Sequence, residues 1–300
     1  MNSKFKESME TQLGLLREYA VKEPERGFTS LIHHVNEGSL KANFYELGRN
    51  RAVGVDQVRW QEYEKELDAN IEDLLERMKR MGYRPQPARR VYISKDEKTL
   101  RPLGLPATED KLVQKTMAGI MEAIYEPCFH EFSYGFRAGK SCHQALKAVG
   151  DIINFKPINH VIEADIKGFF DNVNHEKLME LIKKRITDKK FLRYLVRFLK
   201  SGYIESGILK ETTEGTPQGG NMSPMLANIF LHYVLDEWYV KELKPKLKGQ
   251  SYLVRYCDDF IILVQYQEEA KIVMKQLEAR FREYGLELNA TKTGVKSFGK

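Results

Sequence analysis

The sequence predicts an α+β protein in which helices back an antiparallel sheet. Apolar residues recur at helical spacing in several long segments, and short apolar runs form candidate strands and hairpins. After a helical N-terminal part, a basic hairpin comes first and then strands and helices alternate. That order is typical of the α+β class.

Length and composition indicate a globular protein with a moderate positive charge. The chain has 300 residues, of which 42% are apolar and 30% are charged, and its net charge is +6. This length suffices for one large or two ordinary domains. The three cysteines are widely spaced, so we expect reduced thiols and a cytoplasmic location. No apolar run approaches the ~18 residues of a membrane span, so we expect no membrane partner.

Four segments place their apolar residues on one face, as helices packed on a core do. Gly82 and Gly285 are expected to end the first and the last of them. Ser223 is expected to cap the third, with Pro224 at its first helical position. The segments are 62–81, 109–125, 224–238 and 268–284.

Strands are expected in three places. The run HVIEADI at 160–166 indicates one strand, and the run at 252–264 indicates a hairpin. The runs at 88–95 and 100–106 indicate a second hairpin, which is basic. Together they supply the strands of the predicted fold.

Asp258 and Asp259 stand side by side between the two apolar arms of the hairpin at 252–264. Burying an unpaired carboxylate costs several kcal/mol, so either the tip is solvated or a cation is the partner. Asp165 ends the strand 160–166, and three carboxylates converge if that strand lies beside the hairpin. Carboxylates suit Mg²⁺ or Mn²⁺, and two such ions about 3.5–4 Å apart can activate a hydroxyl and hold pyrophosphate.

Two further features suit an anionic substrate. The glycine-rich loop 214–224 precedes a helix, and its Gln218 offers an amide to a base or sugar. Lys95 and Arg101 flank the tip of the basic hairpin, where they can grip a triphosphate. Taken alone, an ordinary loop and exposed hairpin charges explain the same residues.

Basic residues gather in two blocks. Nine bases face two acids in 77–101, and eight bases face one acid in 183–200. Such blocks suit the phosphates of a nucleic acid, and a solvated helix face is the alternative. The candidate RNA-binding residues are Arg84, Arg89, Arg90, Lys183 and Lys184.

Seven blocks, in order along the chain, resemble the reverse transcriptase of bacterial group II introns, the intron-encoded maturase family. Four of them are SYGFRAGKSCHQAL (133–146), EADIKGFFDNVNH (163–175), GTPQGGNMSPMLANIFL (215–231) and RYCDDFIIL (255–263). The resemblance implies a right-hand polymerase fold of fingers and palm. It also implies DNA synthesis from dNTPs on an RNA template with a DNA primer, and binding of intron RNA for splicing and retrotransposition in a bacterial host.

The resemblance assigns the acids their roles. Asp165 and Asp258 match the metal-binding carboxylates, the backbone carbonyl of Ile166 matches a further ligand, and Asp259 is the third acid. Mg²⁺ is the expected ion, with Mn²⁺ as a substitute. Cys257 stands where the intron enzymes usually have alanine.

Other roles also come only from the resemblance. Phe170 matches the aromatic gate that excludes a ribose 2′-hydroxyl, and core packing is its alternative. Gln218 matches the residue at the nascent base pair, and Lys95 and Arg101 match the triphosphate contacts. Lys292 matches the candidate general acid for pyrophosphate, and a solvated strand end is its alternative.

The resemblance also predicts a domain layout. An N-terminal extension spans 1–49, fingers span 50–159, and a palm spans 160–300, while part of 205–215 is left open between them. A thumb and the maturase or DNA-binding domains are expected to be absent, which should impair polymerisation. An open palm face would then allow a homodimer.

Two other functions remain open at this point. The chain can be primarily an intron-RNA-binding splicing module in which the acids are a retained site. It can also be a retron-type or diversity-generating reverse transcriptase, although the VGVDQV and LRPLGLP blocks favour the intron family.

Overall fold

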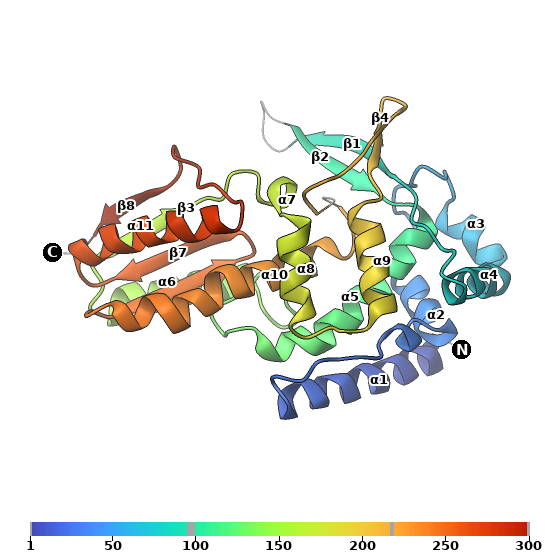
Figure 1. Ribbon diagram of the computed structural model, residues 1–300, viewed down its shortest axis with the longest axis horizontal. Helices are drawn as coiled ribbons and strands as arrows, with labels where there is room; N and C mark the ends of the chain where they lie inside the picture. Colours follow the sequence, from blue (N-terminus) through green and yellow to red (C-terminus); the bar gives the residue numbers. More distant parts are fainter. Residues whose placement is uncertain (1, 95–99, 217–218, 299–300) are drawn as a thin grey trace. The chain divides into compact units, whose positions relative to one another are not determined.

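The computed structural model describes residues 2–94, 100–216 and 219–298. Helices precede the first strand, strands and helices are interspersed after it, and both sheets contain antiparallel pairs (Figure 1). No helix among these residues is both long and apolar enough to cross a membrane.

The chain forms two compact units. The first contains Met1–Cys128 and Ile182–Ser223, and the second contains Phe129–Leu181 and Pro224–Lys300. The predicted fingers (50–159) and palm (160–300) divide the chain differently. Fingers and palm are functional parts of a polymerase, and their predicted boundaries in this chain stay a prediction.

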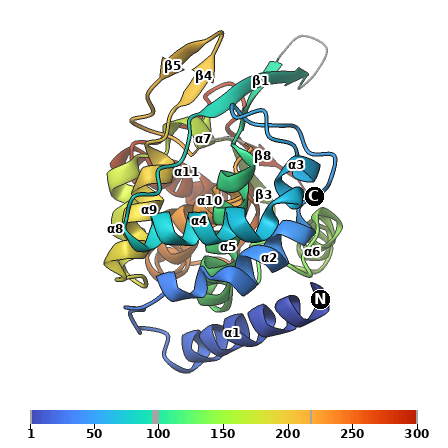
Figure 2. The same cartoon turned by 90° about the vertical axis from the view of Figure 1, so that its right-hand side faces the viewer.

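Helix α5 is the centre of the first unit. Leu112, Met117 and Ile124 on its predicted apolar face are all 0% exposed. Helices α1 and α2 pack on α5 and on each other (Figure 2). The helices of this unit are α1 (Asn2–Lys22), α2 (Glu37–Glu46), α3 (Trp60–Lys65), α4 (Leu67–Lys79), α5 (Thr108–Tyr125) and α9 (Lys189–Leu199), with 3₁₀ turns at Ile32–His34 and Glu126–Cys128.

The predicted helix 62–81 is two helices, α3 and α4. They meet at Glu66, whose backbone is not helical (φ −119°, ψ 33°). The second helix ends at Lys79, and Met81 has a φ of +57° just before Gly82. The apolar period continues across the break, so the sequence pattern alone does not reveal it.

The predicted basic hairpin is confirmed in the first unit. β1 (Ala88–Ser94) pairs antiparallel with β2 (Leu100–Leu105). β1 also pairs in parallel with β4 (Tyr203–Glu205), which forms a second hairpin with β5 (Ile208–Lys210). The strand order of this sheet is therefore β2-β1-β4-β5.

The sheet of the second unit is antiparallel and has the order β6-β7-β3-β8. Its strands are β3 (His160–Ala164), β6 (Ser251–Tyr256), β7 (Asp259–Val264) and β8 (Gly294–Ser297). The strand predicted at 160–166 thus lies beside the hairpin, as convergence of the acids requires.

Helices cover much of this sheet. α11 (Gln267–Glu283) contacts β3, β7 and β8, and α6 (Cys142–Phe155) contacts β6 (Figure 1). Ile162 and Ile262 pair across the two central strands, and both are 0% exposed. Because side chains alternate along a strand, the residues next to Ile162 and Ile262 in the sequence point to the opposite face of the sheet.

The predicted helix after Pro224 is not a regular α-helix throughout. It begins as α10 (Ser223–Leu231) and continues through π-helical turns at His232–Asp236 and Tyr239–Leu243. A π turn has more residues than an α turn, and a pattern of apolar residues does not signal it. The remaining helical elements are α7 (Phe169–Asn172), α8 (His175–Lys183) and a 3₁₀ turn at Lys244–Lys246.

Asp188 joins α9 to the segment before α2 in the first unit. One carboxylate oxygen accepts hydrogen bonds from the backbone N–H groups of Lys190 (2.8 Å) and Phe191 (3.1 Å). The other accepts from Leu31 (2.6 Å) and Ile32 (2.9 Å). Burial alone would raise the pKa of Asp188, but the four N–H donors lower it overall.

We expect Asp188→Ala to lower the free energy of unfolding by about 2 kcal/mol, because it removes a helix cap and leaves backbone donors unpaired. The lowered pKa means that the carboxylate stabilises the fold above its unfolded pKa of about 4 and stops doing so as the pH falls through its folded pKa. Urea unfolding at neutral and acid pH measures this. The difference between the two proteins should shrink in acid, and an equal difference at both pH values would contradict it.

Candidate active site

The pairing of β3 with β7 brings two predicted acids to the same end of the sheet. Ala164 pairs with Phe260 in the antiparallel register. Asp165 comes directly after β3 and Asp259 is the first residue of β7, so both acids lie next to this last pair. Both also line one cavity of about 640 Å³.

A two-residue turn joins β6 to β7 and carries Asp258. Tyr256 pairs with Asp259, which leaves Cys257 and Asp258 as the turn residues. Cys257 has a φ of +59°, which is unfavourable for a residue with a side chain. Burial raises the pKa of its thiol well above the ordinary value, so the thiol stays protonated.

Arg255 holds this turn from inside the second unit. Its side chain is 0% exposed, and its Nη1 donates to the carbonyl of Cys257 at 2.9 Å. Nε and Nη2 donate to the two carboxylate oxygens of Asp236 at 2.8 and 2.5 Å. Nη1 also donates to Oδ1 of Asn228 at 3.0 Å. Because both carboxylate oxygens of Asp236 accept from Arg255, they fix the plane of the guanidinium. The direction of the N–H that donates to the Cys257 carbonyl is fixed with it.

The segment 132–135 supports the same hairpin along the edge of β6. The backbone N–H of Arg255 donates to a carbonyl of this segment at 2.9 Å, and its carbonyl accepts an N–H at 2.8 Å. A Cβ on Gly135 would lie 2.3 Å from the backbone nitrogen of Cys257, so only glycine fits there. Asn228 then donates to the carbonyl of Gly135 at 2.8 Å.

Asp165 lies next to a cation. Nζ of Lys292 is 3.7 Å from Oδ2 of Asp165, and both residues line the cavity. The backbone N–H of Asp165 donates to Oγ1 of Thr293 at 3.3 Å, and its carbonyl accepts from the N–H of Asn289 at 2.8 Å. The loop 289–293 thus positions both the carboxylate and the ammonium group.

The carbonyl of Ile166 points away from this loop. Ile166 forms an antiparallel bridge with Leu288, and the hydrogen bonds of the bridge come from the residues on either side of it. Ile166 and Leu288 therefore form a non-hydrogen-bonded pair. The carbonyl of Ile166 is directed away from Leu288.

The three aspartates do not form a closed cluster. Among the described residues, the group of three potential ligands whose atoms all lie within 4.8 Å of one another is His130, His232 and Glu237. Asp258 is not among the residues that line the cavity. The structure brings together the two aspartates at the strand ends and the lysine beside Asp165.

A family comparison covers this site. The sequence profile described as "Reverse transcriptase (RNA-dependent DNA polymerase)" matches residues 93–297. The chain belongs to the reverse transcriptase family. All the predicted acids and Lys292 lie inside the matched range. Reverse transcriptases in general use divalent metal ions, so a divalent cofactor is confirmed at the level of the family.

Individual relatives agree with the predicted kind of reverse transcriptase. Group II intron-encoded protein LtrA of Lactococcus lactis subsp. cremoris is 44% identical over 185 residues, which is 61% of this chain and 30% of that protein. Protein YkfC of Escherichia coli K12 is 36% identical over 244 residues, which is 71% of this chain and 63% of that protein. The chain thus spans less than a third of the length of LtrA.

A solved structure agrees with the predicted fold. Telomerase from Candida albicans, in complex with a fragment of telomeric RNA, superposes with a TM-score of 0.53 at 12% identity, over 81% of this chain and 47% of that one. At this identity the likeness concerns the fold alone. It confirms the right-hand polymerase class predicted for this reverse transcriptase.

The predicted nucleotide contacts are only partly described. Lys95 and Gln218 lie outside the described residues. Arg101 is exposed in β2, where it pairs with Ile93. Phe170 is half-buried in α7, and its ring packs edge-on near that of its neighbour in the sequence, with 5.3 Å between centroids. The roles of all four stay predictions.

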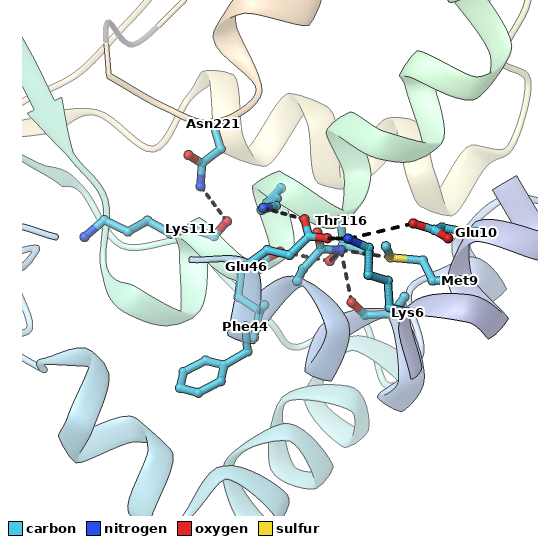
Figure 3. Close-up of polar contacts among 12 residues, drawn as sticks. Lys6, Met9, Glu10, Phe44, Glu46, Lys111, Thr116 and Asn221 are labelled. Atoms are coloured by element: carbon cyan, nitrogen blue, oxygen red, sulfur yellow. Dashed lines mark hydrogen bonds and ion pairs between the residues drawn. The ribbon is translucent and has the colours of Figure 1, made fainter. Parts of the chain in front are cut away.

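The described part of the glycine-rich loop is anchored in the first unit. The N–H of Asn221 donates to Oε1 of Gln114 at 3.0 Å, and Nδ2 of Asn221 donates to the carbonyl of Lys111 at 2.9 Å (Figure 3). Gly219 has a φ of +97°, and a Cβ there would lie 2.7 Å from the carbonyl oxygen of Gly104 in β2. The loop is therefore held between α5 and β2.

A polar network joins α5 to the two N-terminal helices. Asn43 of α2 donates to Oγ1 of Thr116 at 3.1 Å. Glu46 pairs with Lys115 at 2.9 Å and with Lys6 of α1 at 3.5 Å (Figure 3). The N-terminal helices thereby brace the helix on which the glycine-rich loop rests.

The predicted RNA-binding residues fall into two groups. Arg84, Lys183 and Lys184 are exposed. Arg89 instead donates to the carbonyl of Val53 at 2.8 Å, and the guanidinium of Arg90 lies 3.7 Å from the centre of the Tyr203 ring. The second group has structural contacts within the first unit, and RNA contact by either group stays a prediction.

Arg255, Asp236 and Asn228 support the site, and no sequence motif predicts a role for them. A signal was present, because an arginine interrupts the apolar strand SYLVRY and an aspartate interrupts the apolar helix before it. Buried charges need partners, so two interruptions of opposite sign predict a pair. The contact with the Cys257 carbonyl carries no sequence signal.

We expect Asp236→Asn to lower the free energy of unfolding by about 3–5 kcal/mol, because it leaves the buried Arg255 without its counter-charge. Urea unfolding measures the change. The matched control is Glu268→Ala, which removes the exposed Glu268–Lys271 pair and should cost less than about 1 kcal/mol. Equal effects of the two substitutions would contradict a structural role for the buried pair.

Proposed function

We propose that this chain is the catalytic part of a group II intron reverse transcriptase, which extends a DNA primer with dNTPs on an RNA template. The observation that carries the proposal is that Asp165 and Asp259 line one cavity at the ends of paired strands, with Lys292 beside Asp165 and Asp258 in the adjoining turn. The family and the relatives support it.

The donor set suits Mg²⁺, with Mn²⁺ as a substitute. Asp165, Asp258, Asp259 and the carbonyl of Ile166 offer only oxygen atoms, which hard divalent cations prefer. A divalent ion bound here would lower the pKa of the primer 3′-hydroxyl and neutralise charge on the leaving pyrophosphate. Lys292, with its Nζ 3.7 Å from Oδ2 of Asp165, places one positive charge beside this carboxylate.

The side chains of the chain itself have separate tasks in this reaction. The carboxylates would orient the reacting groups, and Lys292 would give a proton to pyrophosphate as its bond to the α-phosphorus breaks. Phe170 would stand against the sugar and exclude a 2′-hydroxyl. Lys95, Arg101 and Gln218 would hold the triphosphate and the base.

We expect Asp165→Asn and Asp258→Asn each to reduce primer extension by at least about 10²–10³-fold, because each removes a charged ligand while keeping its shape. Extension of a labelled DNA primer on an RNA template with Mg²⁺ measures this, and RNA affinity should remain unchanged.

Glu163→Gln is the matched control. Glu163 lines the same cavity from β3 and pairs with Lys296, but it has no predicted catalytic role. Its variant should keep extension within a few-fold of wild type. Activity of the two aspartate variants equal to that of the control would remove the acids from catalysis.

A second function, the binding of intron RNA for splicing, is favoured by the exposed bases of the first unit. We expect Arg84→Ala and Lys183→Ala each to weaken RNA binding and to lower the slope of log affinity against log salt by about one, as loss of one phosphate contact does. Filter binding at several salt concentrations measures this. Lys275→Ala, at an exposed position of α11, is the control and should leave the slope unchanged. Slopes that match the control for both variants would exclude these residues from the RNA surface.

A further inference from the structure

Three potential metal ligands meet in the second unit, outside the predicted active site. His130, His232 and Glu237 each offer one atom, and the three atoms lie within 4.8 Å of one another. Nε2 of His130 and Oε1 of Glu237 are 2.8 Å apart. Ligand atoms around a tetrahedral zinc ion lie about 3.3 Å apart, since Zn–N and Zn–O bonds are about 2.0–2.1 Å. The 2.8 Å separation and the 4.8 Å upper limit are compatible with that value.

The backbone is shaped to bring two of these ligands together. His232 and Glu237 are five residues apart, and an α-helix would point them about 140° from each other. Here the N–H of Glu237 donates to the carbonyl of His232, which is the hydrogen bond of a π turn. The wider turn brings the two side chains to a common side, where His130 lies.

The buried histidine of the group has an unused nitrogen. His232 is 3% exposed, and its Nδ1 has no hydrogen-bond partner among the described residues. A neutral imidazole offers the lone pair of one ring nitrogen to a metal ion. A buried polar atom without a partner is costly unless something binds it.

We propose that His130, His232 and Glu237 bind a zinc ion, with water as the fourth ligand. Two imidazoles and one carboxylate form a ligand set that zinc uses in proteins. Mg²⁺ prefers oxygen ligands, so this site and the aspartate site select different metals.

The other charged side chains next to the three ligands do not prevent an ion from binding. Glu237 also pairs with Lys241, whose side chain is 70% exposed and can turn into solvent at little cost. Asp236 is already bound to Arg255 and does not compete. The ring of His130 stacks on Phe132 at 4.9 Å between centroids, which holds its orientation.

The ion would connect the segment that begins at Phe129 to the π-helical segment 232–237. Both segments also support the Asp258 turn, the first through residues 132–135 and the second through Asp236. Zinc at this site would therefore stabilise the second unit behind the turn. The inference concerns binding and stability, and it stands whether or not the chain polymerises DNA.

The experiment is a zinc titration of the untagged, metal-stripped full chain. We expect one Zn²⁺ per chain after gel filtration, a rise in melting temperature, and a tetrahedral visible spectrum when Co²⁺ replaces Zn²⁺. His130→Gln and Glu237→Gln should each weaken Zn²⁺ binding by more than about tenfold, since even losing the partner of a ligand costs 10–100-fold. Both residues are partly exposed, and circular dichroism checks that the variants fold.

Two controls separate this site from others. His143→Gln removes an exposed histidine of α6, and Asp258→Asn removes a predicted catalytic acid. Both should bind Zn²⁺ as wild type does. The proposal is overturned if wild type retains no zinc, if His130→Gln and Glu237→Gln retain it unchanged, or if Asp258→Asn loses it.

Discussion

The buried pair of Arg255 and Asp236 is the interaction on which the predicted active site depends. Both side chains are 0% exposed, so neither charge has water as an alternative partner. An arginine offers five N–H donors in a rigid plane, and here that plane is fixed by two contacts to one carboxylate. Because the plane is fixed, the remaining donors reach Asn228 and the Cys257 carbonyl in one orientation.

This arrangement explains how the turn tolerates an unfavourable backbone. Cys257 has a positive φ that glycine would adopt more easily, and such strain persists only where the surroundings determine it. The guanidinium holds its carbonyl, and Gly135 closes against its nitrogen. The strained residue comes directly before Asp258, so the same contacts limit where that carboxylate can go. Apolar side chains could fill the space next to the turn, but they have no N–H to donate to the Cys257 carbonyl.

The sequence predicted the parts of this structure that depend on local pattern. Short apolar runs predicted the hairpin at 252–264 and the strand containing Ile162, and the position of Asp165 at the end of that strand predicted its approach to the hairpin once the two lie side by side. It could not predict the break at Glu66 or the π turn at His232, because an apolar stripe shows which face is buried and not how many residues make each turn. The contact of Arg255 with the Cys257 carbonyl could not be predicted, because the direction of a buried guanidinium depends on partners, such as Asn228, that the fold brings together. The family resemblance supplied the roles of Phe170 and Lys292, which pattern alone left open.

The helical segment 228–237 shows why its irregular geometry matters. Asn228 and Asp236 are both directed to Arg255, while His232 and Glu237 meet His130. Asp236 and Glu237 are neighbours in the sequence, yet they serve different partners on different sides of the segment. In an α-helix Glu237 would turn away from His232, and the second group would not form. With the π turn, the segment makes its contacts with Arg255 and also brings His232 and Glu237 to His130. One segment can therefore support the Asp258 turn directly, through the buried ion pair, and also hold the chain segment that closes against the turn from the edge of β6.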